Sequence, residues 1–167
     1  MNAKVMDRAQ LEAQFNRAHI SKRDFEEALE YLRAFHARLR VSLKRAILLA
    51  AIVAYSRPFA QSRSGVHRKA TSALNGNPQN VLSDQEYLLH QKLLSLRHEA
   101  LAHSSYDRKP TARVSGTSRG FLVQSRPFDL LSERIDVKSF CSMCEKMINH
   151  CTDKLFELNR RLERQDA

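Results

Sequence analysis

Arg97 and His103 are the two residues whose chemistry fits their surroundings least. They occur in the stretch Leu93–Tyr106, which reads LLSLRHEALAHSSY and places its leucines at a helical spacing. A helix that only packs would prefer apolar residues near these positions. Arginine carries a permanently charged fork of donors that binds anions, and histidine can take or give a proton near neutral pH. The pair therefore indicates a site that holds an anion and moves a proton.

The six-residue step from Arg97 to His103 limits how the two can act together. Leu89, Leu93 and Leu96 begin an apolar seam that ends on His103, and Arg97 lies on the line of residues beside it. On a straight α-helix, six residues turn by about 600°, so the two side chains would point about 120° apart and lie about 9 Å apart along the axis. One helix does not easily bring them to a single phosphate. Two such helices facing each other across a two-fold axis do.

The helix that carries both residues, hereafter the motif helix, is predicted over about residues 84–105. Ser83-Asp84-Gln85-Glu86 forms a capping box, which predicts a helix start at about Asp84. Pro110 follows the predicted end, where a helix cannot easily continue.

The part of the chain before the first proline is also predicted to be helical. Val5–Ala18 favours a short charged helix, and Ser21 favours a new helix start. No Gly or Pro interrupts the apolar stripe over residues 22–55, so this span is either one long helix or two helices that meet near Arg40–Ser42. Ala46–Tyr55 is apolar nearly all round, which is typical of a central helix.

Residues 106–135 form a basic insertion that is not predicted to be helical. Arg113–Ser115 and Gly120–Gln124 flank a Gly-Thr-Ser-Arg turn and could pair as a short β-hairpin. The cations of this insertion are Arg108, Lys109, Arg113, Arg119 and Arg126.

The chain closes with a helix predicted over residues 136–164. Its apolar positions recur at a helical spacing and form a seam of Val137, Phe140, Cys144, Met147, Cys151, Leu155, Leu158 and Leu162. Together these elements predict an all-α fold, a four- to five-helix bundle with a loop-rich insertion, built as a single domain over residues 1–167.

The composition restricts the class of partner and the compartment. Lys+Arg 28 against Asp+Glu 18 gives a net charge of +10, which favours nucleic acid over a membrane as partner; the alternative is an ordinary solubility charge. The longest apolar run, Ala46–Tyr55, has about half the length that a bilayer span needs. Met1–Gln14 is charged and lacks the apolar segment of a signal peptide, and the three cysteines suggest reduced thiols. We expect a cytoplasmic protein.

Two patches of the sequence resemble one known family. Arg97–Ser104, which reads RHEALAHS, resembles the arginine, polar residue, spacer and histidine motif of the HEPN superfamily. Ala51–Phe59, which reads AIVAYSRPF, is similar to an earlier helix of HEPN-like proteins from phage abortive-infection and toxin–antitoxin loci. The resemblance implies a helical homodimer in which two Arg–His sets converge on one composite site.

The resemblance also implies a reaction, because the residue types fit the cleavage of RNA. A neutral His103 could take the proton of the 2′-OH, which then attacks phosphorus and leaves a 2′,3′-cyclic phosphate. Arg97 would stabilise the charge that develops on the phosphorane oxygens. This chemistry requires no metal and no cofactor.

Other residues are assigned to RNA binding rather than to the chemical step. His98 could act with His103, and Ser104 and Tyr106 could contact phosphate or ribose. Arg57 matches an arginine of the family's earlier helix. The insertion supplies Arg108, Lys109 and Arg113.

Each of these assignments has a structural alternative. Arg97 could pair with a buried carboxylate, and His103 could cap the end of its helix. Ser104 could be a backbone cap. Arg57 could be a helix-end cation that interacts with the helix dipole.

Cys141, Cys144, His150 and Cys151 suggest a zinc site, but we interpret them as helix residues of the core. All four fall within the predicted C-terminal helix, and Cys144 and Cys151 belong to its apolar seam. Zinc ligands usually come from a turn and a second element. Cysteine also behaves as a small buried hydrophobe.

The functional hypothesis is a metal-independent endoribonuclease of HEPN type, acting as a homodimer and as a toxin or phage-defence effector, with an antitoxin protein as a further possible partner. The alternative is a non-catalytic nucleotide- or nucleic-acid-binding helical module. Only the first predicts that RNA is cleaved in EDTA and leaves cyclic-phosphate ends.

Overall fold

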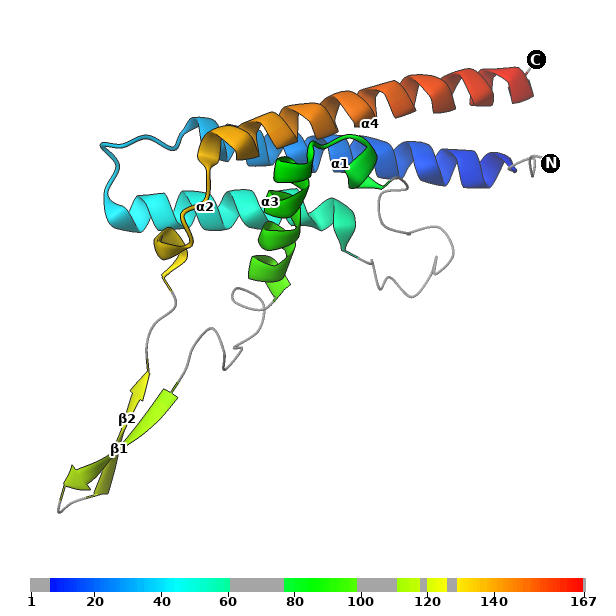
Figure 1. Ribbon diagram of the computed structural model, residues 1–167. Helices are drawn as coiled ribbons and strands as arrows, with labels where there is room; N and C mark the ends of the chain where they lie inside the picture. The colour runs from blue at the N-terminus through cyan, green and yellow to red at the C-terminus, as the bar shows by residue number, and fades with distance from the viewer. Residues whose placement is uncertain (1–6, 61–76, 99–110, 118–119, 126–128, 167) are drawn as a thin grey trace.

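The structure, a computed structural model, describes residues 7–60, 77–98, 111–117, 120–125 and 129–166, with the backbone alone over 111–117 and 120–125. Its helices are α1 (Arg8–Arg33), α2 (Val41–Ser56), α3 (Asp84–Ser95) and α4 (Val137–Asp166). Figure 1 shows α4, α1 and α2 running side by side, with α3 crossing them and the two termini at the same end. The predicted all-α bundle is confirmed.

Helix α1 is a single helix where the sequence pattern predicts two. It begins after Asp7, whose carboxylate accepts a hydrogen bond from the backbone N–H of Gln10 at 2.7 Å. The predicted start at Ser21 is wrong, because Ser21 lies fully buried inside the helix. The packed positions run through this point without a break, so burial against the neighbouring helices outweighs the capping tendency of serine. They are Leu11, Ala18, Ser21, Phe25, Ala28 and Leu32.

The structure resolves the open question over residues 22–55 in favour of two helices. α1 ends at Arg33 and α2 begins at Val41, close to the predicted junction. Helix α2 is less central than its apolar composition suggests. Leu48, Ala51 and Ile52 are buried, but the opposite side of the helix faces outward.

Helix α3 begins at the predicted capping box. The Ser83 hydroxyl accepts a hydrogen bond from the backbone N–H of Glu86, and the Glu86 carboxylate accepts one from the backbone N–H of Ser83 at 2.8 Å. The same carboxylate accepts hydrogen bonds from Ser142 at 2.9 Å and Lys146 at 2.7 Å, which joins α3 to α4. Burial acts to raise the pKa of Glu86, but the hydrogen bonds from Lys146, Ser83 and Ser142 lower it to about 2.

The predicted end of the motif helix near residue 105 lies outside the described residues and stays a prediction. α-Helical hydrogen bonding stops at Ser95, and one π turn follows over residues 96–98. Residues 99–105 lie outside the described ranges. Leu93 and Leu96 are fully buried, so the predicted seam is confirmed over its described part.

The basic insertion contains the predicted hairpin. β1 (Thr111–Thr117) and β2 (Gly120–Ser125) pair antiparallel, with Arg113 opposite Val123. One short 3₁₀ turn, η4 (Leu130–Glu133), precedes α4.

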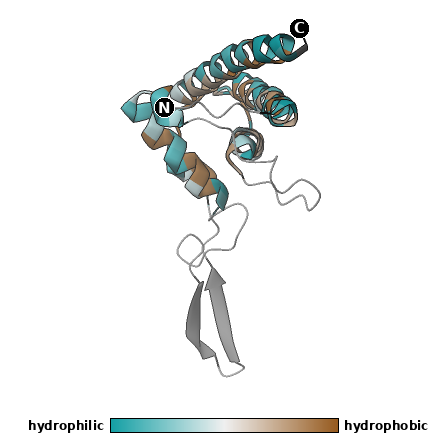
Figure 2. Cartoon of the chain, turned by 90° about the vertical axis from the view of Figure 1, so that its right-hand side faces the viewer, coloured by the Kyte–Doolittle hydropathy of each residue, from teal (hydrophilic) through white to brown (hydrophobic). Residues whose placement is uncertain are grey.

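The core lies where α1, α2, α3 and α4 meet. Phe25, Tyr55 and Phe140 are fully buried there, and Tyr55 packs edge-on against Phe140 with ring centroids 5.2 Å apart. Figure 2 shows hydrophilic and hydrophobic residues on different sides of the long helices, as amphipathic packing requires. Among the described residues, no helix is both long and apolar enough to cross a membrane.

Candidate functional site

Arg97 lies in the π turn that follows α3. Its neighbour Leu96 is fully buried, Arg97 itself is half-buried and His98 is exposed. The chain therefore passes from core to solvent within three residues, with Arg97 at the boundary. A π turn is an uncommon widening of a helix that occurs often at functional sites. It departs from the straight α-helix for which the 120° offset between Arg97 and His103 is expected.

Arg97 has no carboxylate partner within the described part of the chain: its guanidinium group makes no ion pair or side-chain hydrogen bond there. The structural alternative, in which Arg97 pairs with a buried carboxylate, thus finds no such carboxylate among these residues. A half-buried guanidinium without a counter-ion is available to an anionic ligand.

Most of the other predicted site residues lie outside the described ranges. These are His103, Ser104, Tyr106, Arg108 and Lys109. Arg113 lies in β1, where the structure describes the backbone alone. The convergence of Arg97 and His103 therefore stays a prediction.

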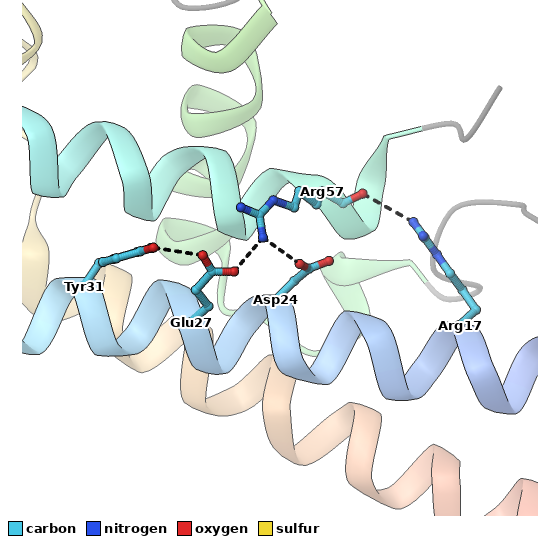
Figure 3. Close-up of polar contacts among 5 residues, drawn as sticks. All are labelled: Arg17, Asp24, Glu27, Tyr31 and Arg57. Atoms are coloured by element: carbon cyan, nitrogen blue, oxygen red, sulfur yellow. Dashed lines mark hydrogen bonds and ion pairs between the residues drawn. The ribbon is translucent and has the colours of Figure 1, made fainter. Parts of the chain in front are cut away.

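Arg57 links the end of α2 to the middle of α1. Its Nη1 donates hydrogen bonds to Asp24 Oδ1 at 3.0 Å and to Glu27 Oε2, both on α1 (Figure 3). Tyr31 donates its hydroxyl hydrogen to the other oxygen of Glu27 at 2.9 Å. From about two turns before Asp24 on α1, Arg17 donates to the carbonyl oxygen of Pro58 at 2.8 Å.

The ion pairs and hydrogen bonds of this cluster shift the pKa values of its members. Hydrogen bonds from Arg57 and Tyr31 lower the pKa of Glu27, and the two carboxylates raise the pKa of Arg57. Burial raises the pKa of Asp24 more than Arg57 lowers it. The positive charge of Arg57 is thus balanced by α1, and its predicted contact with RNA stays a prediction.

His90 is a buried residue to which the sequence pattern assigns no role. It is 5% exposed, and its Nδ1 lies 2.9 Å from the hydroxyl oxygen of Tyr55, within hydrogen-bonding distance. The imidazole stacks on Tyr87 and meets the edge of Phe59 at a centroid distance of 4.6 Å. Burial lowers the pKa of His90 to about 4, so the ring is neutral at physiological pH.

His90 and Arg97 are related by the geometry of α3. His90 lies in the regular part of α3, and Arg97 lies in the π turn that continues from it. The hydrogen bond between His90 and Tyr55 fixes α3 against α2 and thereby helps to set the position of the π turn. The signal that could have identified His90 is a polar ring on the buried line of an otherwise apolar helix.

The cysteines of α4 occupy core positions, as the seam predicts. Cys144 and Cys151 are fully buried, and burial raises the pKa of both thiols, to about 11 for Cys151. Across the described residues, His, Cys, Asp and Glu side chains form no group suited to a metal ion.

Comparisons with protein-family models, with curated proteins and with solved structures find no match to this chain.

Proposed function

We propose that the chain is a metal-independent endoribonuclease of HEPN type that acts as a homodimer. The observation that supports this most is the half-buried Arg97 guanidinium, placed on a π turn at the end of α3 without a carboxylate partner among the described residues. The net charge of +10 supports a polyanionic substrate. The all-α bundle agrees with the fold that the resemblance implies.

In this proposal the RNA supplies its own nucleophile. His103 takes the proton from the 2′-OH, the 2′-oxygen attacks phosphorus, and the bond to the 5′-oxygen breaks as that oxygen receives a proton. Arg97 donates hydrogen bonds to the phosphorane oxygens, whose charge grows in the transition state. A two-fold dimer supplies two copies of His103, which could divide the base and acid roles between them.

The biological setting is part of the proposal and rests on the resemblance. An effector that cleaves RNA in phage defence or in a toxin–antitoxin pair would act in the cytoplasm and would need an inhibitor while dormant. An antitoxin protein is the partner that this setting predicts.

The test is cleavage of a labelled RNA by the full chain in the presence of EDTA. We expect products that end in 2′,3′-cyclic phosphate, and no product at a linkage whose 2′-OH is replaced by hydrogen. His103→Ala should remove cleavage and leave RNA binding within a few-fold, whereas His36→Ala, which changes an exposed histidine of the α1–α2 loop, should leave both unchanged.

The alternative, a non-catalytic nucleic-acid-binding module, is favoured by the same net positive charge. It predicts RNA binding that Arg97→Ala weakens, with no cyclic-phosphate product under any of these conditions. Intact RNA after prolonged incubation with protein that binds it would select this alternative.

A further inference from the structure

Helix α2 carries an exposed apolar stripe on the side away from the core. Ala46, Leu49 and Val53 follow one another at helical spacings of three and four, and Leu49 and Val53 are 40% and 36% exposed. The stripe leads into Arg57, one turn beyond Val53. Figure 3 shows the Arg57 ion pairs on the face of α1 and α2 that looks away from α3 (green, behind). The stripe thus belongs to a face distinct from the one that carries the motif helix.

The segment around the start of this stripe carries several arginines and no acidic residue. Residues 34–60 contain no Asp or Glu. Arg38 and Arg40 are exposed and have no ion pair within the described part of the chain. Arg45, also exposed, forms a surface pair with Asp129 at 3.0 Å, and such pairs contribute little. No side chain caps the first turn of α2, so the positive end of the helix dipole adds to the same charge.

At the far end of the stripe, the carboxylates nearest to Arg57 are already paired. Asp24 and Glu27 lie there, and Arg57 already binds both. Two copies of this face would therefore bring Arg38 and Arg40 of one copy toward the same arginines of the other, with Asp24 and Glu27 already paired.

We propose that this face, the α2 docking face of Arg38, Arg40, Ala46, Leu49 and Val53, binds an acidic amphipathic helix of a partner protein. The partner's apolar residues at helical spacing would pack on Leu49 and Val53, and Ala46 lets the two backbones approach closely. Its carboxylates would lie against Arg38 and Arg40. The inference does not depend on RNA cleavage, and it leaves Arg97 uncovered because the docking face looks away from α3.

Other occupants fit the face less well. An RNA backbone would leave Leu49 and Val53 in contact with phosphate and water. Helices that lie on a membrane usually carry aromatic residues on their apolar side, whereas this stripe has none.

The test uses a synthetic amphipathic peptide of about 20 residues, with leucines at helical spacing and glutamates beside them, titrated into the full chain by fluorescence anisotropy. We expect micromolar binding that weakens with salt. Leu49→Ser together with Val53→Ser should reduce affinity roughly tenfold, and Arg38→Glu together with Arg40→Glu by a similar factor. Leu88→Ser, at a 65% exposed leucine of α3, and Arg164→Glu, in the last turn of α4, are the matched controls and should have no effect.

Three results would overturn the proposal. The first is equal binding of a peptide in which lysine replaces each glutamate. The second is a peptide affinity unchanged in both double variants. The third is that the acidic peptide does not bind, whereas phosphatidylserine vesicles, RNA or a second copy of the chain bind in a manner that depends on Leu49.

Discussion

At the scale of single residues, the arginines of this chain differ in how their charge is balanced. Arg57 lies between Asp24 and Glu27, whereas Arg97 has no carboxylate partner among the described residues. An arginine bound by two carboxylates holds helices together, and an arginine without one can receive an anion. Position in the sequence does not separate these two roles, because both residues follow an apolar helix. The charge partners of the two arginines separate these roles, and those partners come from other elements of the fold.

The burial of His90 predicts a pH dependence of stability. Its pKa is about 4 in the folded chain against an ordinary 6.5, so below pH 6.5 the unfolded chain binds a proton that the folded chain excludes. The free energy of unfolding should therefore fall as pH falls from 6.5 to 4, by up to about 3 kcal/mol from this ring alone. His90→Asn lacks this titration, so the difference in free energy of unfolding between wild type and His90→Asn should shrink as the pH falls from 6.5 to 4. Urea unfolding at several pH values measures the difference.

A control separates His90 from the other groups that titrate in the same range. His36→Asn removes an exposed histidine and should leave the pH profile of the wild type unchanged. A stability difference between wild type and His90→Asn that stays constant from pH 6.5 to pH 4 would show that His90 is not held neutral by burial.

At the scale of elements, the position of α3 depends on Glu86. This one carboxylate completes the capping box and also binds Ser142 and Lys146 of α4. The same carboxylate therefore caps α3 and joins it to α4, so α3 cannot shift along α4 without breaking both sets of hydrogen bonds. The link matters for function because the π turn with Arg97 continues directly from α3.

Glu86→Ala should lower the free energy of unfolding by about 2 kcal/mol or more, since it removes a cap and leaves half-buried donors without an acceptor. Glu145→Ala is the comparison, because Glu145 forms only an exposed pair with Arg33 at 3.6 Å and should change stability by less than about 0.5 kcal/mol. Equal losses for the two variants in urea unfolding would contradict the assigned role of Glu86.

The elements that the sequence predicts correctly are those determined by near neighbours. The capping box at Ser83 links residues that are three apart. The hairpin pairs two strands that are neighbours in the sequence, and the apolar residues of α4 recur at a regular helical spacing. The errors concern contacts between distant segments. Helix α1 continues through Ser21 because other helices cover it, and one face of α2 is open because no described element covers Leu49 and Val53. No local pattern contains that information.

In the candidate site, too, the sequence predicts what depends on near neighbours and misses what depends on distant segments. The sequence identifies Arg97 because a charged residue interrupts a helical seam, and its π turn could not be foreseen from the spacing. His90 escapes sequence reasoning because its role depends on Tyr55, which is 35 positions away in the chain. The pairing of Arg57 depends likewise on Asp24 and Glu27, at separations of 33 and 30.

At the scale of the whole molecule, charge should control how RNA is held. The net charge of +10 includes the cations of the basic insertion, and each phosphate contact releases a counter-ion. Replacing Arg108, Lys109 and Arg113 together with Ala should flatten the slope of log affinity against log salt by up to about three units. The rate of cleavage at saturating RNA should hardly change, because none of the three is assigned to the scissile bond. An unchanged slope would direct attention to Arg63, Arg68 and Lys69 instead.

The role of Arg97 is measured by the single-turnover rate of RNA cleavage in EDTA, compared among wild type, Arg97→Ala and Arg33→Ala. Arg33 is the matched control, since its side chain is 67% exposed and, among the described residues, its one ion pair is long. We predict that Arg97→Ala lowers the rate by about a hundredfold or more, while the variant stays folded and Arg33→Ala cleaves at the wild-type rate. Cleavage by folded Arg97→Ala at the wild-type rate would contradict the account, because it would remove Arg97 from the reaction.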